Sequence, residues 1–260
     1  MGRKHPGEEE KKQETWIVFK ELNVDPHQKN DYYSIGDEIT VHATLLVSIL
    51  KIDEDRTIVY GCSFEGANLT DGPDPPKNLL SDLVGIGETV RCTFQPQDTG
   101  QKTINVSVRF GFSTEGYSVI WFMDREHERQ VVLEGKDIVA EYGMDKESTS
   151  VYSGGPLEIG IKRFEMPYSV RADGSTSTIG FTFTNKKEGQ ILAMNDIIIT
   201  LPREITFEPD FAACPLIKTG DTYHLNTTRL GRGVTFPLRK DDYFTITCKM
   251  KIDQDIVGDI

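Results

Sequence analysis

The 260-residue sequence lacks several features that would place it in a functional class at once. It contains no apolar run of the length that a membrane-spanning helix needs, so no such helix is expected within the chain. Residues 1–15, MGRKHPGEEEKKQET, contain no apolar core of a signal peptide. We therefore expect either a cytosolic protein or an extracellular region whose signal and anchor lie outside this chain.

Positive charge is also scarce. The 29 Lys and Arg are outnumbered by 41 Asp and Glu, which gives a formal net charge of −12. Proteins that bind nucleic acid present a basic face to the phosphate backbone. We therefore expect no nucleic-acid partner, and contact with a membrane only through an anchor outside this chain.

Catalytic motifs are missing as well. The sequence contains no Walker A pattern, no G-x-G-x-x-G opening a helix, no H-E-x-x-H and no G-x-S-x-G. A glycosidase needs only two carboxylates, but the acidic runs at 53–56, 124–128 and 240–242 are typical of turns and solvated faces. We therefore expect that this protein is not an enzyme and has no catalytic residues.

Cysteine is rare, and its four positions are informative: Cys62, Cys92, Cys214 and Cys248. None is part of a C-x-x-C pair, and the five His are scattered, which argues against a zinc site. Their even number and equal division between the halves predict two disulfides, Cys62–Cys92 and Cys214–Cys248, and hence an oxidising compartment. The alternative is four buried thiols in a cytosolic β-protein.

What the sequence does contain is alternation of apolar and polar residues. In residues 241–252 (DDYFTITCKMKI), one face of an extended chain takes Phe244, Ile246, Cys248, Met250 and Ile252. Residues 38–47 (EITVHATLLV) and 103–110 (TINVSVRF) alternate in the same way. Runs at roughly regular spacing with turn signals between them predict an all-β fold. The segment 71–78 (DGPDPPKN) is expected to be a loop that no strand accommodates.

The pattern of charged, apolar and polar residues divides the chain into four parts. Residues 1–15 are expected to be a flexible tether, 16–124 a first β-sandwich domain, and 151–260 a second one. Residues 125–150 are charged and lack alternation, which predicts a short, partly helical linker. The antibody pattern of an early Cys, a central Trp and a late Cys is not present, so we expect two tandem Ig-like sandwiches with an unusual crosslink.

Three asparagines lie in N-x-S/T patterns and are candidate glycosylation sites: Asn68, Asn105 and Asn226. Two adjacent aromatics, Tyr32 and Tyr33, are candidate binding residues, because loop tyrosines stack on sugars or anchor protein interfaces. The alternative is a tyrosine folded over the end of the sandwich as a lid. No cofactor is expected. If a structural calcium ion is bound, its candidate ligands are Asp71, Asp74, Asp241 and Asp242.

Several segments together resemble a known family. They are VRCTFQP (90–96), INVSVRFGF (104–112), YSVIWFMD (117–124), GKDIVAEYGMD (135–145), GGPLEIGI (154–161), TIGFTFTNKKEGQI (178–191) and IIITLP (197–202). This combination resembles secreted or membrane-anchored archaeal surface proteins built from tandem Ig-like or CARDB-type β-sandwich domains. The resemblance implies a place at the cell envelope and a role in adhesion, envelope structure or assembly. It implies no catalytic residues.

We therefore expect a non-catalytic, extracellular or cell-surface structural or interaction protein, a glycoprotein if its sequons are used. Its partner would be a protein or glycan at the cell envelope. The alternative is a carbohydrate-binding or accessory module of a secreted hydrolase. A cytosolic scaffold with free thiols is the third possibility.

Overall fold

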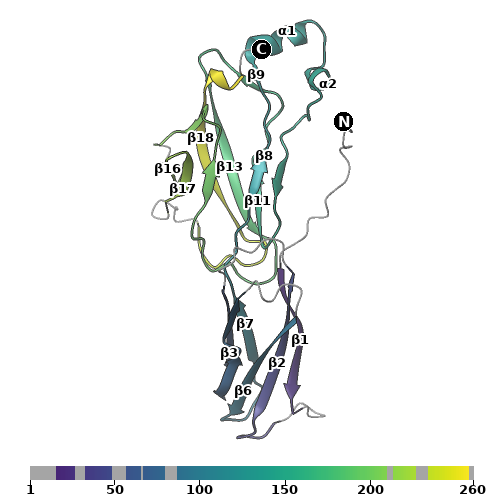
Figure 1. The fold of residues 1–260 in the computed structure, drawn as a ribbon, viewed down its shortest axis with the longest axis vertical. Coiled ribbons are helices and arrows are strands. Elements are labelled where there is room, and N and C mark those ends of the chain that lie inside the picture. The colour runs from purple at the N-terminus through teal and green to yellow at the C-terminus, as the bar shows by residue number, and fades with distance from the viewer. Residues whose placement is uncertain are drawn as a thin grey trace. The chain divides into compact units, whose positions relative to one another are not determined.

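The computed structural model describes residues 16–26, 33–48, 57–65, 67–79, 87–209, 213–226 and 234–257. The chain divides after Ser113 into two compact units, unit 1 (Met1–Ser113) and unit 2 (Thr114–Ile260). Strands dominate both units, and their sheets are mostly antiparallel (Figure 1). The all-β class expected from the alternation is confirmed.

Unit 1 consists of two antiparallel sheets. The larger has the order β1-β2-β6-β4 and the smaller the order β5-β3-β7. The strands of the larger sheet are β1 (Trp16–Asp25), β2 (Ile39–Ser48), β6 (Gly87–Pro96) and β4 (Ala67–Asp74). Those of the smaller sheet are β5 (Lys77–Leu79), β3 (Thr57–Phe64) and β7 (Ile104–Arg109).

The two sheets of unit 1 pack face to face across one apolar core. Every second residue of β2 is turned inward, and five such residues from Ile39 to Val47 are at most 2% exposed. Val90, Cys92 and Phe94 of β6 are fully buried, and Ile58 and Tyr60 of β3 meet them from the other sheet. The period of two in the sequence therefore sets which face of each strand is buried.

The segment 71–78 differs from the expected loop. Residues Asp71 to Asp74, including Pro73, form the end of β4, and β5 begins at Lys77. Strand β4 tolerates the proline because it is an edge strand whose register against β6 shifts on either side of Asp71. The expectation that no strand could include this segment was wrong.

Unit 2 has a four-stranded sheet of order β11-β13-β18-β15 and a three-stranded sheet of order β14-β17-β16. Their strands are β11 (Leu157–Ile161), β13 (Ser175–Asn185), β18 (Tyr243–Ile252), β15 (Ile205–Phe207), β14 (Ile198–Thr200), β17 (Thr222–Leu225) and β16 (Leu216–Thr219). Strand β18 has the expected buried face, since each residue from Phe244 to Ile252 at alternate positions is at most 5% exposed. The short 3-10 helix η3 (Gln254–Val257) follows β18.

Two short strand pairs and two helices complete unit 2. Strand β8 (Gly116–Ser118) pairs with β10 (Ser150–Tyr152), and β9 (Phe122–Asp124) runs parallel to β12 (Tyr168–Val170). Because these partners lie in the second half of the chain, the segment from 114 onward belongs to unit 2, whereas the sequence suggested a first domain ending at 124.

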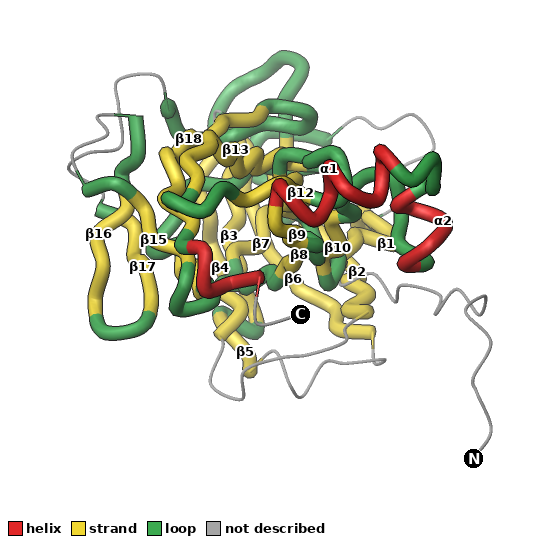
Figure 2. The backbone as a smooth tube through the Cα atoms, turned by 90° about the horizontal axis from the view of Figure 1, so that it is seen from above, coloured by secondary structure: helices red, strands yellow, loops and turns green. Residues whose placement is uncertain are grey.

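The expected linker is helical and packed. Helices α1 (Arg125–Leu133) and α2 (Ile138–Tyr142) are capped at their N-termini by Asp124 and Asp137. The side chains of these two residues accept hydrogen bonds from N–H groups in the first turn of each helix. Val131 and Ile138 are buried with methionines of the neighbouring segments, and α1 lies alongside β9 and β12 (Figure 2). Residues 125–150 are therefore part of unit 2. Among the described helices, none is long and apolar enough to cross a membrane.

Candidate binding sites

One disulfide in each unit connects its two sheets. Cys62 on β3 is bonded to Cys92 on β6, with Cα atoms 6.4 Å apart. Cys214, just before β16, is bonded to Cys248 on β18, with Cα atoms 4.6 Å apart. Both Cα separations lie in the usual disulfide range, and the pairing is the one expected from the sequence. Two crosslinks indicate an oxidising environment.

In the described part of unit 1, one layer has more strands than the other. Strand β3 lies across from β6, to which it is crosslinked, and it also contacts β4. Strand β5 begins at Lys77, directly after β4 ends at Asp74, which sets β5 on the β4 side of β3. Strand β7, on the other side of β3, then lies across from β2, and no described strand lies across from β1. Among the described residues, β1 pairs only with β2 and β7 only with β3.

The inner face of β1 is incompletely covered as a result. Phe19 is paired with Leu45, and Leu22 with Ala43, so both point to the same face as these two fully buried residues. Nevertheless Phe19 is 40% and Leu22 is 55% exposed. Apolar side chains on the core side of a sheet are normally covered by the opposite layer. Here the opposite layer, as far as the structure describes it, has no strand across from β1.

The inner face of strand β7, in the other layer, is also incompletely covered. Its inward residues Ile104, Val106 and Val108 pack against the core but are only half-buried. We call these three residues, together with Phe19 and Leu22, the open side of unit 1.

The hydrogen bonding of β7 shows which backbone groups are unpaired at this edge. The N–H of Glu65 donates to the C=O of Thr103 (N···O 3.2 Å), so this pair is a hydrogen-bonded one in the β3–β7 register. In an antiparallel ladder such pairs recur at every second residue. The backbone groups of residues 105, 107 and 109 therefore point to β3, and those of residues 104, 106 and 108 point away from it, to the edge.

Three polar side chains in unit 2 form a hydrogen-bonded chain. His224 Nδ1 lies 2.9 Å from Asp196 Oδ2, and His224 Nε2 lies 2.9 Å from Thr222 Oγ1. Burial acts to raise the pKa of Asp196, but hydrogen bonds from His224 and from the N–H groups of Leu225 and Ile197 outweigh it and lower that pKa. No sequence pattern predicted this cluster, because its members are distant in the chain and fit no fixed motif.

The order acid, imidazole, hydroxyl is that of a nucleophilic triad, but the surroundings favour a structural role. Thr222 Oγ1 donates to the C=O of Thr219 (3.2 Å), and Thr222 and His224 are neighbours on one face of β17. The side chains of Asp196 and His224 are 40% and 36% exposed. The cluster ties the segment before β14 to β17.

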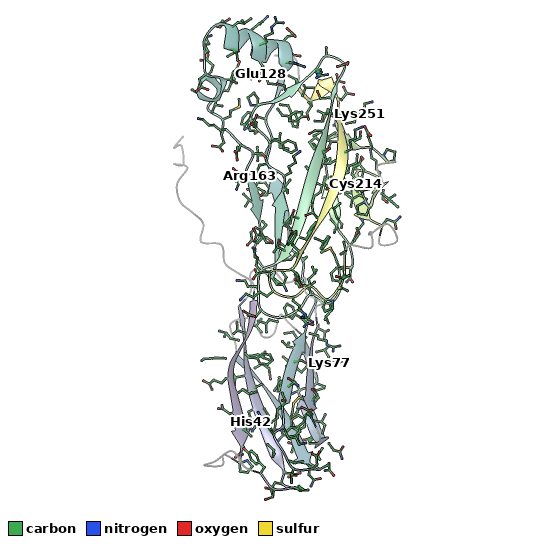
Figure 3. All side chains as sticks on the ribbon, turned by 180° about the vertical axis from the view of Figure 1, so that it is seen from behind. His42, Lys77, Glu128, Arg163, Cys214 and Lys251 are labelled. Atoms are coloured by element: carbon green, nitrogen blue, oxygen red, sulfur yellow. A yellow bond between two sulfur atoms is a disulfide. The ribbon has the colours of Figure 1, made fainter. Side chains whose placement is uncertain are left out.

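A groove of about 850 Å³ lies between α1 and the adjoining strands of unit 2. We call it the α1 groove. Its charged lining comprises Arg125, Glu128, Arg129, Arg171, Asp173 and Lys251. Figure 3 shows Glu128 on α1 and Lys251 on β18 at the helical end of this unit. Burial raises the pKa of the Glu128 carboxyl, although the charge of Arg125 opposes this.

The structure gives different surroundings to the three sequon asparagines. Asn68 on β4 and Asn105 on β7 have exposed side chains. Asn226 follows β17 and is half-buried. Both β4 and β7 are edge strands of their sheets. Asn68 and Asn105 are therefore accessible to a glycosyltransferase.

The tyrosine pair is only partly described. Tyr32 lies outside the described residues. Tyr33 is half-buried, and its hydroxyl donates to the C=O of Pro26 (3.1 Å). This contact fits the lid-like tyrosine better than an outward-facing binding residue.

Three of the four candidate calcium ligands have other partners. Asp71 and Asp74 lie 3.2 and 3.5 Å from the guanidinium of Arg91. Asp242 accepts a hydrogen bond from the N–H of Arg239, and Asp241 is in the left-handed region with φ 64°. Within the described ranges, no group of three or more His, Cys, Asp or Glu is arranged to hold a metal.

Comparison with known proteins adds no assignment. No protein-family model matches the sequence, and no curated protein matches it either.

Proposed function

We propose that this protein is a non-catalytic, extracellular or cell-surface interaction protein that binds a partner protein by accepting a β-strand at the open side of unit 1. Its role would be adhesion, envelope structure or assembly, as the resemblance to archaeal surface proteins implies. The disulfide in each unit supports a place outside the cytoplasm, where crosslinks keep a small core folded.

The strand order of unit 1 supports an Ig-like sandwich. In the constant-type Ig fold, one sheet has the order ABED and the other CFG. The order β1-β2-β6-β4 corresponds to ABED, and β3-β7 corresponds to CF, with β5 on the far side of β3. The place of strand G, beside β7 and across from β1, is taken by no strand in the described part of the chain.

The open side is the observation on which the proposal depends. A strand added beside β7 would pair with the outward backbone groups of residues 104, 106 and 108 and would cover Phe19 and Leu22. Strand addition of this kind draws affinity from main-chain hydrogen bonds and specificity from alternate side chains. The partner segment must therefore be extended, with apolar residues at every second position. Residues 1–15 of this chain have no such alternation.

A binding experiment with two short synthetic peptides tests the proposal. One peptide carries valine or isoleucine at alternate positions with threonine or lysine between them, and the other has the same length and composition without alternation. We expect saturable binding of the first alone. Leu22→Asp should weaken it at least about tenfold, because burying a leucine is worth roughly 1.5–3 kcal/mol.

Val59→Asp is the matched control, because Val59 lies on the outer face of β3 and is 47% exposed. It should leave peptide binding unchanged. Equal binding of both peptides, or an equal effect of the two substitutions, would contradict strand addition. A dimer that Leu22→Asp disrupts would instead identify a second copy of this chain as the occupant.

Carbohydrate binding, the alternative expected from the sequence, finds little support at Tyr33, the described member of the tyrosine pair. The hydroxyl of Tyr33 is engaged by Pro26. If saturable binding to a polysaccharide were lost on Tyr33→Ala, that alternative would be favoured. A different surface, the α1 groove, has the chemistry for a sugar ligand.

A further inference from the structure

We infer that the α1 groove is a binding site for an acidic glycan, a polysaccharide that bears carboxylate or sulfate groups. This site lies in unit 2 and does not depend on strand addition in unit 1. The groove has a local excess of positive charge, in a chain whose formal net charge is −12. Four cationic side chains line the groove, against the two carboxylates of Glu128 and Asp173.

Most of these cations are available to a ligand. Arg125, Arg171 and Lys251 form no ion pair within 4.0 Å with any residue that the structure describes. Arg129 lies 3.6 Å from Glu126, but both side chains are at least 70% exposed, so this pair is weak. Guanidinium groups bind carboxylate and sulfate-like oxyanions through paired hydrogen bonds. The groove therefore offers donors without first having to break a strong internal ion pair.

The walls that present these cations are rigid. Between β12 and β13 the chain makes a tight turn, in which the N–H of Gly174 donates to the C=O of Arg171 (2.8 Å). Ser175 Oγ accepts from the N–H of Arg171 (3.1 Å). Gly174 has φ 82°, and a Cβ there would lie 2.9 Å from the C=O of Ile252, so glycine is required. This turn fixes the backbone from which Arg171 projects.

The uncharged part of the lining suits a sugar. Ser169, Ser175 and Thr176 offer hydroxyl groups, and Tyr168 offers an aromatic ring. The ring of Tyr168 is held in edge contacts with Phe122 and Phe164, at centroid distances of 5.8 and 5.6 Å. A fixed aromatic ring beside hydroxyls can bind a sugar face and its hydroxyl groups together.

Other anionic ligands fit less well. A protein interface is expected to have a largely apolar centre of aromatic and aliphatic anchors. Among the described residues that line this groove, Val132 is the one aliphatic side chain and Tyr168 the one aromatic side chain, and the other side chains are charged or bear hydroxyl groups. A nucleic acid would need an extended basic face, which the overall charge opposes. An acidic glycan matches both the cations and the hydroxyl-rich walls.

Calorimetric titration of the full chain tests the inference with three defined probes. They are an oligogalacturonate for carboxylate, a dextran sulfate oligosaccharide for sulfate, and a neutral dextran oligosaccharide of equal length. We expect one or both acidic probes to bind at physiological ionic strength and the neutral probe not to bind. The stronger of the two acidic probes identifies the anionic group.

Two substitutions and one matched control locate the site. Arg171→Gln should weaken binding at least about tenfold, since a charge-assisted hydrogen bond is worth roughly 1.5–3 kcal/mol. Glu128→Gln should tighten binding, because it removes a negative charge from the groove. Arg163→Gln makes the same charge change as Arg171→Gln in unit 2 but outside the groove, on a side chain 75% exposed and paired with Glu147; Figure 3 shows its place. It should change binding less than about twofold.

Each contrary result has a clear meaning. Binding of neither acidic probe would overturn the inference. Equal weakening by Arg163→Gln and Arg171→Gln would also overturn it, because binding would then follow the overall charge rather than the groove. If Arg171→Gln lowers the unfolding temperature, the result for Glu128→Gln decides, since a loss of fold cannot tighten binding.

Discussion

Reduction of the crosslink between Cys62 and Cys92 should lower the free energy of unfolding of unit 1 by about 3.7 kcal/mol, the loop-closure term of the chain-entropy model. The bonded residues are 30 apart in the sequence. Opening a loop of this length returns about 12 cal/mol/K to the unfolded chain, which gives about 3.7 kcal/mol near room temperature. Reduction leaves both sulfur atoms in place, so the core gains no cavity and the loop term can be measured almost alone.

Hydrogen exchange resolves this effect for each unit. The slowest amides of β2 and β6 report the unfolding of unit 1, and those of β13 and β18 report that of unit 2. A loss of about 3.7 kcal/mol corresponds to exchange about 500-fold faster after reduction. Unit 2 should respond almost equally, because Cys214 and Cys248 are 34 residues apart. Acceleration of less than about tenfold in fully reduced protein would refute the view that these crosslinks stabilise the two cores.

Three further predictions concern single residues. Burial, and then the charge of Glu88, raise the pKa of Tyr60 to about 12. The neutral phenol therefore contributes its full share to the free energy of unfolding below pH 10, and this share should fall by about 1.4 kcal/mol as pH rises from 9 to 11. In urea unfolding measurements, Tyr60→Phe should remove this fall. Gly72→Ala should lower the free energy of unfolding by about 1–3 kcal/mol, and by more than Gly100→Ala. Both glycines have positive φ, but only at Gly72 would a Cβ lie 2.5 Å from a backbone carbonyl oxygen. Equal shifts of the unfolding temperature in the two variants would contradict this. The pKa of Asp196 is lowered, so its carboxylate stabilises the fold above pH 4, and this stabilisation is lost as pH falls further. Asp196→Asn should therefore reduce the loss of unfolding free energy between pH 5 and 3, by less than about 1 kcal/mol. A larger loss in the variant than in the unchanged protein would contradict the assignment.

The strands were predictable from the sequence wherever both layers of a core are complete. In residues 39–47 and 244–252, the alternating residues are buried almost fully, as their pattern indicated. The cysteine pairing was also predictable, because each half of the chain has one pair at a spacing that closes a moderate loop. These features depend on local period and on count, which a sequence shows directly.

The boundary between the units and the binding surfaces could not be predicted in the same way. Residues 117–124 alternate like a strand of the first half, but β8 and β9 pair with β10 and β12 of unit 2. The α1 groove brings together Arg125, Arg171 and Lys251 from three distant segments. The open side arises because, among the described strands of unit 1, one layer has a strand fewer than the other. All three depend on long-range pairing, which periodicity does not specify.

The most direct test of the proposed strand addition is the exchange of individual amides in β7, measured by NMR on the isolated protein. The register predicts alternation along this strand: the amides of Asn105, Ser107 and Arg109 are hydrogen-bonded to β3 and should be protected, whereas those of Ile104, Val106 and Val108 should exchange rapidly. Adding the alternating peptide should then protect the second set. Equal protection of all six amides before any peptide is added would show that the edge is already occupied and would contradict the proposed acceptor site.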